Sequence, residues 1–269
     1  MHGKQCLHRV HLDRSPYNSR ATPAWNASTY LTEYYSRIEP TEKFTLRFLL
    51  DALTELPPGG RAIDFGAGPT MHTAIALAGH VAEIHIADLL PENLRAIRRW
   101  QLRTEDAHDW SAFTREILNL EGLSGPTAAQ VSEREMLARR LLTRVMPGNA
   151  GRRHPLGAQL RAHYGCVASF FCADSATSSL GEWQRYMRNI LSLLAPGGLL
   201  VMGALRRCAA WRIGRSRMPS PRVDERHMQL MLDSAGFARA CQILEVRTVP
   251  DQVGNGFDSL MLVRARAPA

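Results

Sequence analysis

Apolar residues recur along the chain at two spacings, one typical of helices and one typical of strands. Leucines at three- and four-residue intervals predict an amphipathic helix over residues 30–56, which a pair of prolines ends. A short apolar run over 62–65 predicts a strand, and residues 71–78 predict a helix after it. The same order is predicted for a strand over 84–88 and a helix over 91–103, which has a proline in its first turn. Strands that alternate with helices favour a parallel sheet covered by helices.

Residues 104–162 interrupt this alternation. They are polar, contain several glycines and prolines, and hold one helical stretch over 133–145, so we expect an insertion around a weak third strand. Beyond it we expect, in chain order, a strand over 166–171, a helix over 181–194, a strand over 198–205, a helix over 224–235 and closing strands over 241–248 and 257–263. The predicted fold is α/β, a doubly wound and mostly parallel sheet in one domain over 26–265. Residues 1–25 lack periodicity and are predicted to form a flexible tail.

The basic charge of the chain changes this picture little. The formal net charge is +8, but only two of the 33 basic residues are lysines, and the arginine pairs are scattered and flanked by acids. A nucleic-acid site would favour clustered positive charge with interleaved aromatic residues. We therefore expect a solvated surface and no nucleic-acid partner.

Cysteine usage and hydropathy indicate the compartment. Five cysteines without a CxxC pair argue against a disulfide scaffold or a zinc ribbon, so we expect no metal and a reducing compartment. The first thirty residues contain no apolar signal-peptide core, and the longest apolar stretches are far shorter than the roughly 20 residues that span a bilayer. A cytoplasmic protein that does not bind membranes is the expectation.

The candidate chemistry begins where the first predicted strand ends. Gly66 and Gly68 in the turn after that strand would let the backbone approach a ligand, and the following helix offers free amide groups. A dinucleotide site would have a third glycine where this chain has Met71, so a pyrophosphate fits poorly. Asp88 ends the second strand, 24 residues after Asp64, where a carboxylate can bind the two hydroxyls of a ribose. Ribose without pyrophosphate indicates S-adenosylmethionine (SAM).

Further motifs carry a resemblance to a known family. They are Tyr30-Leu31-x-x-Tyr34-Tyr35, Ile63-Asp64-Phe65-Gly66-Ala67-Gly68-Pro69-Thr70, Asp88-x-x-x-x-Asn93, Trp100, Asp109-Trp110-Ser111, Phe171-Cys172-Ala173-Asp174, Leu193-Leu194-Ala195-Pro196-Gly197-Gly198 and Ala235-Gly236-Phe237. With these motifs the chain resembles, over about residues 25–265, the small-molecule family of nicotinamide, phenylethanolamine, indolethylamine and thioether methyltransferases. The resemblance implies a class I methyltransferase fold, which is Rossmann-like with a seven-stranded sheet, and N-terminal lid helices over 26–56.

The resemblance also implies which residues bind SAM. Tyr30 and Tyr35 would close over the cofactor and bind its methionine carboxylate, although tyrosines on an amphipathic helix are equally typical of a core. Asn149 and Ala150 fall where the family has an Asp and an apolar residue at the adenine, and an asparagine carbonyl can still accept from the adenine amino group. Gly66, Gly68 and Thr70 would line the methionine portion, and Asp88 and Asn93 the ribose and nearby adenosine. The other residues expected at the cofactor are Asp64, Ala67, Leu89 and Phe170.

Two residues are candidates for catalysis. Asp174 matches a position where the family has an acid near the acceptor amine, and it would either take a proton or orient the acceptor. Its alternative role is a helix cap after the fourth strand. His72 replaces a tyrosine of the nicotinamide enzyme and is either a base or a packed helix residue.

The acceptor side departs from the family pattern. Tyr34, Phe171 and Trp211 are expected there, and Phe171 and Trp211 are interpreted as aromatic walls or as core residues. Arg215 stands where the phenylethanolamine enzyme has a Glu near its amine, and a guanidinium suits a carboxylate or another acceptor group on the substrate. Gly203 stands where the nicotinamide enzyme has an Asp, which disfavours nicotinamide as the substrate.

The sequence thus predicts a SAM-dependent methyltransferase that releases S-adenosylhomocysteine (SAH). Its predicted reaction is N-methylation of a small aromatic or heterocyclic amine, in specialised metabolism. The alternatives are methylation at carbon of an electron-rich ring such as an indole, and a cofactor-binding protein without activity. A small-molecule acceptor is the expected partner, and the chain is expected to be a monomer or a weak homodimer.

Overall fold

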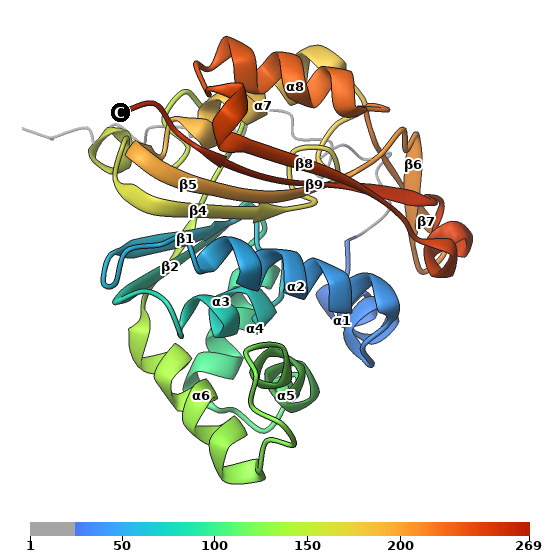
Figure 1. Cartoon of the computed structure of the whole chain (residues 1–269). Coiled ribbons are helices and arrows are strands. Elements are labelled where there is room, and N and C mark those ends of the chain that lie inside the picture. The colour runs from blue at the N-terminus through green and yellow to red at the C-terminus, as the bar shows by residue number, and fades with distance from the viewer. Residues whose placement is uncertain (1–24) are drawn as a thin grey trace, which may run out of the picture.

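A seven-stranded sheet with the order β3-β2-β1-β4-β5-β9-β8 forms the centre of the computed structural model, which describes residues 25–269 (Figure 1). All neighbouring strands run parallel except β9, which is antiparallel to both β5 and β8. The predicted mostly parallel α/β sheet is therefore confirmed. Its strands are β1 (Arg61–Phe65), β2 (Glu83–Asp88), β3 (Leu142–Pro147), β4 (Tyr164–Phe170), β5 (Leu194–Leu205), β8 (Gln242–Thr248) and β9 (Ser259–Arg266). Apart from Trp25, the tail predicted over 1–25 lies outside the described residues.

Helices cover both faces of this sheet. The helices α7 (Leu180–Leu191) and α8 (Glu225–Ser234) lie on one face (Figure 1). The other face carries α2 (Pro40–Leu53), α3 (His72–Leu77) and α4 (Pro91–Leu102), with α5 (Ser111–Leu120) and α6 (Ala128–Leu141) packed further out. The short α1 (Ala27–Tyr35) lies beside α2 at the edge of the molecule. Short 3₁₀ turns occupy Ala158–Leu160, Arg239–Cys241 and Pro250–Asn255.

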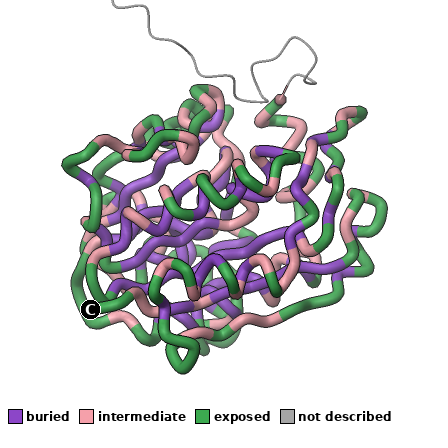
Figure 2. The backbone as a smooth tube through the Cα atoms, turned by 90° about the horizontal axis from the view of Figure 1, so that it is seen from above, coloured by how far each residue is buried: buried purple, intermediate pink, exposed green. Residues whose placement is uncertain are grey.

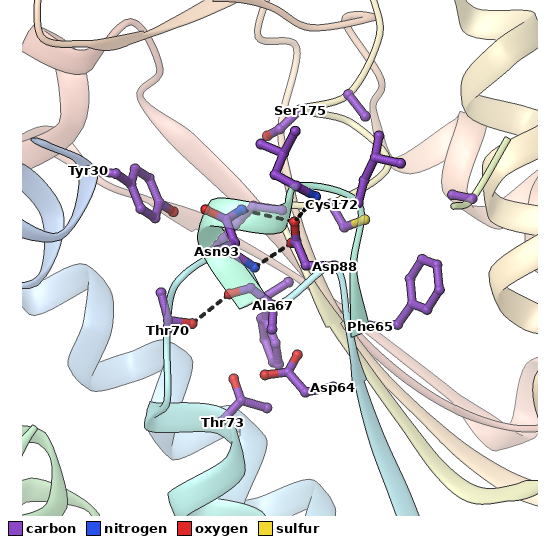
Figure 3. Close-up of a pocket in the computed structure, with 18 of the residues that line it drawn as sticks. Tyr30, Asp64, Phe65, Ala67, Thr70, Thr73, Asp88, Asn93, Cys172 and Ser175 are labelled. Atoms are coloured by element: carbon purple, nitrogen blue, oxygen red, sulfur yellow. Dashed lines mark hydrogen bonds between the residues drawn. The ribbon is translucent and has the colours of Figure 1, made fainter. Parts of the chain in front are cut away.

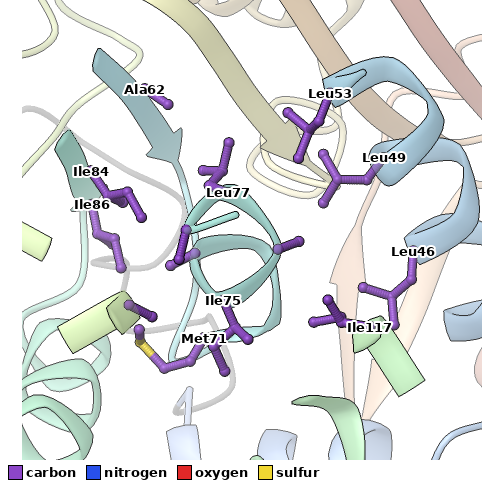
Figure 4. Close-up of a cluster of buried hydrophobic side chains, with 14 of the residues drawn as sticks. Leu46, Leu49, Leu53, Ala62, Met71, Ile75, Leu77, Ile84, Ile86 and Ile117 are labelled. Carbon is purple, nitrogen blue, oxygen red and sulfur yellow. The ribbon is translucent and has the colours of Figure 1, made fainter. Parts of the chain in front are cut away.

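The sheet is buried because helices pack on both of its faces. Figure 2 shows that the buried residues follow the central strands, while the outer turns of the helices are exposed. On the face that carries α2 and α3, Leu46, Leu49, Ile75, Leu77 and Ile84 meet in one cluster with at most 1% of each side chain exposed (Figure 4). This packing fixes the ends of β1 and β2 relative to the helices that follow them.

The helix predicted over 30–56 is two helices. The α1 helix ends at Tyr35, and α2 begins at Pro40. Proline disfavours helical backbone in the residue before it, and Glu39 is accordingly extended with ψ 168°. Glu39 and Glu42 then form a reciprocal capping box at the start of α2.

Three further elements differ from the sequence prediction. The helix predicted over 133–145 lies at 128–141, and its expected last turn is the start of the edge strand β3. The α5 helix was not predicted. Nor was a two-stranded hairpin of β6 (Ala210–Ile213) and β7 (Ser216–Pro219), whose four-residue strands are too short to give a clear period and are joined by a turn in which Gly214 has a φ of 56°.

Within residues 25–269, no helix combines the length and the hydropathy that crossing a bilayer requires.

Candidate active site

A cavity of about 390 Å³ lies where β1, β2 and β4 end. The chain order of the sheet reverses between β1 and β4, and ligands of open α/β sheets bind at such a switch point. The volume is in the range of small-molecule sites. Besides the three strand ends, α1, the start of α2, the segment 148–151 and the β6–β7 hairpin contribute to the lining.

The turn after β1 brings backbone close to the cavity. Gly66 and Gly68 have φ values of 73° and 63°, which favour glycine. A Cβ atom on Gly66 would lie 2.1 Å from Cys172 Sγ, so the end of β4 closes directly over this turn. The hydroxyl of Thr70 donates to the carbonyl of Ala67 (2.7 Å) and holds the far side of the turn in place (Figure 3).

Asp88 connects this turn to the end of β2. Its carboxylate accepts from the Gly68 amide (2.8 Å), the Leu90 amide (2.8 Å) and the Asn93 side-chain amide (2.9 Å) (Figure 3). Burial raises the pKa of Asp88, and hydrogen bonds from Leu90, Asn93, Gly68 and the Leu89 backbone oppose that shift. A carboxylate so well supplied with donors is held in one orientation at the end of β2. Trp25 Nε1 donates to Asn93 Oδ1 (2.8 Å), which fixes the orientation of the Asn93 amide.

Asp64 presents an unsatisfied acidic group to the same cavity. It is 2% exposed, and its Oδ2 atom has no hydrogen-bond partner among the described residues. Burial, and then the charge of Asp88, raise its pKa to about 8. A cationic ligand would satisfy this carboxylate, because it supplies both donors and the missing positive charge. The residues present therefore fit SAM: a glycine turn, a ribose-type acid and an orphaned acid facing a cationic methionine portion.

The tyrosines of α1 line the cavity and also pack against the core clusters. Only Leu31 of α1 is buried, whereas Tyr30, Tyr34 and Tyr35 are half-buried and face the cavity. The rings of Tyr30 and Tyr35 lie 5.5 Å apart, and burial raises the pKa of Tyr30 to about 12. The hydroxyl of Tyr34 donates to the carbonyl of Arg212 on the hairpin (2.6 Å). The predicted lid residues are thus placed over the cavity, and α1 is tied to β6.

Asn149 and Ala150, predicted at the adenine, also line the cavity. Leu89 and Phe170, predicted at the cofactor, line it as well, together with Tyr186 of α7. Asn149 Oδ1 accepts from the Gly151 amide (2.8 Å). The side-chain carbonyl that was predicted to accept from the adenine amino group therefore also stabilises the loop that contains it. The Ala150 carbonyl accepts from Asn189 of α7 (2.7 Å), which fixes this segment against the helix.

His72 lies at the start of α3 among aromatic rings. Its ring stacks on Tyr35 with centroids 5.1 Å apart and packs near Trp110 and Phe113. Its Nδ1 atom is buried and has no partner within residues 25–269. Burial lowers the pKa of His72 to about 4, so the ring is neutral near pH 7 and a weak proton acceptor.

Asp174 is fully buried and is not among the residues that line the cavity. Its Oδ2 atom accepts from the Leu205 amide (2.8 Å) at the end of β5, whereas Oδ1 has no partner in the described part of the chain. Ser179, not Asp174, caps α7, so Asp174 is not the cap of that helix. Burial raises the pKa of Asp174 to about 7, and its charge contributes to the raised pKa of Tyr30. The field of Asp174 therefore reaches the cavity from behind its wall.

The two residues predicted as aromatic walls line the cavity. Phe171 and Trp211 both line the cavity, and Trp211 Nε1 has no partner among residues 25–269. Phe171 has a φ of 53°, a strained value for a bulky residue, and its amide donates to the Gly203 carbonyl (2.8 Å). A Cβ atom on Gly203 would lie 2.9 Å from the Phe170 ring, so there is no room for an aspartate at this position.

The structure does not bring Arg215 to the cavity. Arg215 is exposed in the turn between β6 and β7 and is absent from the lining, so it does not occupy the place predicted for it beside the acceptor.

Several residues that line the cavity were not predicted from the sequence, among them Glu42, Leu205, Gln252 and Phe257. Glu42 follows Pro40 at a capping-box position, which could have been read, but the irregular segment with Gln252 and Phe257 carries no pattern.

Solved structures share this fold at low sequence identity. The N-methyltransferase NodS from Bradyrhizobium japonicum WM9, in complex with SAH, superposes with a TM-score of 0.53 at 13% identity, covering 91% of this chain and 94% of that one. A SAM-dependent methyltransferase from Methanosarcina mazei gives a TM-score of 0.54 at 11% identity, covering 87% of this chain and all of that one. The fold is that of class I SAM-dependent methyltransferases.

Sequence comparison then identifies the family. The profile of the NNMT/PNMT/TEMT family matches residues 15–266, and the chain belongs to this family. It is 26% identical to the mouse indolethylamine N-methyltransferase (96% of this chain, 97% of that one) and 29% identical to the human nicotinamide N-methyltransferase (79% and 82%). The human phenylethanolamine N-methyltransferase is 27% identical (92% and 94%). The protein is thus a SAM-dependent methyltransferase, as its sequence predicted.

The buried acids of the cavity predict a pH-dependent stability. Burial raises the pKa of Asp64 to about 8 and those of Glu42 and Asp174 to about 7, whereas in the unfolded chain such groups titrate near 4. Between pH 6.5 and 8 the folded state therefore loses protons that the unfolded state has already lost, and stability falls as pH rises. We expect a loss of about 2 kcal/mol, or a fall in Tm of roughly 5 °C, for the ligand-free protein.

The window begins at pH 6.5 because the lowered pKa of His72 gives the opposite trend at lower pH. Thermal melts of wild type and Asp64→Asn check the expectation, since the variant lacks the largest contributor and should show a shallower fall. A Tm that is constant or rises across the window in the wild type would contradict it.

Proposed function

We propose that this enzyme transfers the methyl group of SAM to the nitrogen of a small aromatic or heterocyclic amine in specialised metabolism. The observation that carries the proposal is that Tyr34, Phe171 and Trp211 line the same cavity as Asp64 and Asp88. A flat acceptor would then stack beside the cofactor in a site that excludes water. The N-methyltransferase names of the indolethylamine, nicotinamide and phenylethanolamine relatives support the same reaction.

Bound SAM supplies an electrophilic methyl group on a sulfonium, so the chain has mainly to align the acceptor with it. We assign the methionine portion to the glycine turn, with Asp64, Ala67 and Thr70 beside it. Tyr30 and Tyr35 would bind the methionine carboxylate, and Asp88 with Asn93 would hold the ribose. Leu89, Asn149, Ala150 and Phe170 would surround the adenine.

The acceptor is proposed to differ from nicotinamide. The rings of Phe170 and Phe171 fill the space beside Gly203, where the nicotinamide enzyme has an acid, so an amide-orienting carboxylate is missing at that point. This altered pocket supports an acceptor from specialised metabolism. A panel of arylethylamines, indoles, pyridines, guanidines and amino acids, assayed by SAH release, tests the proposal. Turnover of an arylethylamine or pyridine supports it, and turnover confined to guanidines or amino acids would refute it.

Asp174 is proposed to act as a positioning residue through its charge. Methyl transfer moves the positive charge from sulfur to the acceptor nitrogen, and a buried carboxylate behind the cavity wall stabilises that charge. We expect Asp174→Asn to lower kcat about tenfold or more, because a neutral amide can keep the Leu205 hydrogen bond but not the charge. SAM affinity should stay within about twofold.

The pH profile separates this role from a structural one. The ionised form of Asp174 dominates above its pKa of about 7, so the wild-type kcat should rise with pH through that value. The rise should be absent from Asp174→Asn. An unchanged kcat, or the same pH profile in both proteins, would make Asp174 a purely structural link between β4 and β5.

A further inference from the structure

Glu42 brings to the cavity a carboxylate that the sequence motifs did not indicate. It is the third residue of α2, half-buried, and part of the cavity lining. Its Oε2 atom accepts from the Glu39 amide (2.9 Å), which closes the capping box and fixes the side chain. The carboxylate is therefore held in one position, with its second oxygen outside that hydrogen bond.

Glu42 has no ion-pair partner within residues 25–269; Arg37 and Lys43 on either side of it in sequence pair with Glu39 and Glu116 instead. The negative charges of Asp251 and Glu39 act on its carboxylate. Thr41 and Gln252 beside it both donate to Asp251 (2.7 and 3.0 Å) and not to Glu42. Burial accordingly raises the pKa of Glu42 to about 7. An acidic group in such surroundings is stabilised by a cation that enters the cavity.

Aromatic walls of the same cavity suit a cation with an apolar body. Trp211 packs with Tyr34 and Phe257 in one cluster at the hairpin, and all three line the cavity. The only arginine among the described lining residues is Arg185, which pairs with Glu182 (3.3 Å) and lies over Tyr186, far along the sequence on α7. Aromatic faces and one carboxylate attract an ammonium group, and Arg212, whose charge reaches Tyr34, is exposed and not part of the cavity lining.

We propose that Glu42 is the specificity-determining residue that binds the ammonium group of the acceptor, so that the enzyme selects alkylamines with an aromatic body over neutral analogues. The proposal rests on the proposed function, since it places an amine acceptor in this half of the cavity. The other cation that enters the cavity is the methionine portion of SAM. Asp64, which lies at the glycine turn with an unpartnered oxygen, is the better partner for that group.

Calorimetric titration of the SAH-loaded protein tests the assignment without relying on turnover. The probes are 2-phenylethylammonium and 2-phenylethanol, which share a shape and differ in charge. The wild type should bind the ammonium about tenfold or more tightly than the alcohol. In Glu42→Gln this preference should fall to about twofold or less, with the SAH Kd within about twofold of wild type.

Glutamine suits this test because it can still accept from the Glu39 amide and keep the capping box. Glu133→Gln on the exposed side of α6 removes the same charge outside the cavity and should keep the wild-type preference. The assignment is overturned if Glu42→Gln keeps the preference, if it weakens SAH instead, or if the wild-type SAH complex shows no preference for the ammonium. If the wild type methylates amines while Glu42→Gln keeps the preference for the ammonium probe, only the role of Glu42 fails. If the wild type binds SAH and methylates no amine, the proposed function fails.

Discussion

Asp88→Ala is expected to weaken SAM binding about 100-fold or more, the largest effect on affinity of any single substitution in the cavity. The carboxylate accepts from Gly68, Leu90 and Asn93, which orient it at the cavity for a ribose hydroxyl. Alanine removes the ligand contact and also leaves buried donors unpaired, so the turn that approaches the methionine portion loses its support. Calorimetric titration with SAM and SAH measures the loss.

Two controls separate binding from folding in this test. Asp51→Ala removes an exposed carboxylate from α2 and should leave the SAM Kd and the Tm unchanged. Asp88→Asn keeps the shape of the side chain, but its amide group faces the Gly68 or Leu90 amide, so that two donors oppose each other. The SAM affinity of this variant should therefore lie between those of wild type and Asp88→Ala. Near-normal SAM affinity in a folded Asp88→Ala protein would refute the assignment of the ribose site.

Gly66→Ala is expected to destabilise the protein far more than Gly68→Ala, although both glycines have positive φ values. The added Cβ would lie 2.1 Å from Cys172 Sγ at position 66, but it would meet only a Tyr30 ring carbon, at 3.8 Å, at position 68. Both variants carry a backbone cost of about 1 kcal/mol, and Gly66→Ala adds the displacement of the β4 end, at about 1–3 kcal/mol more. Thermal melts of the ligand-free proteins compare the two.

The comparison also tests whether the β4 end closes over the glycine turn. If the steric conflict is the cause, Cys172→Gly should restore part of the stability lost in Gly66→Ala and none of that lost in Gly68→Ala. Equal Tm values for the two alanine variants would show that backbone strain alone decides, and that Cys172 does not lie against Gly66 as described.

The parallel core of the sheet could be predicted because its strands are buried on both faces. The run at 198–205 is continuous and apolar, and those at 62–65 and 84–88 are mostly apolar, with Asp64 in the first and His85 and Asp88 in the second. The edge strand β3 has no such signal, since only two of its six residues are buried and it follows α6 without a break. Its place in the sheet is set by pairing with β2.

The cofactor side of the cavity could be predicted for a related reason. Gly66 and Gly68 lie in the turn after β1 and Asp88 ends β2, so the order of the strands brings them together. The proposed acceptor side is lined by α1, the start of α2, the β6–β7 hairpin and the segment near Gln252, which are far apart in the sequence. No local pattern predicts that Glu42 and Trp211 line the same cavity. For the same reason the prediction for Arg215, which was made by alignment through this region, was wrong: Arg215 lies in an exposed turn.

The central claim is transfer of a methyl group from SAM to nitrogen, and the most direct test follows that group into the product. The enzyme is incubated with SAM carrying a ¹³C-labelled methyl group and with the best acceptor of the amine panel, and the product is analysed by NMR and by mass-spectrometric fragmentation. We predict one SAH per labelled methyl and a label bonded to nitrogen. A label bonded to a ring carbon, or SAH release without a methylated amine, would contradict the account.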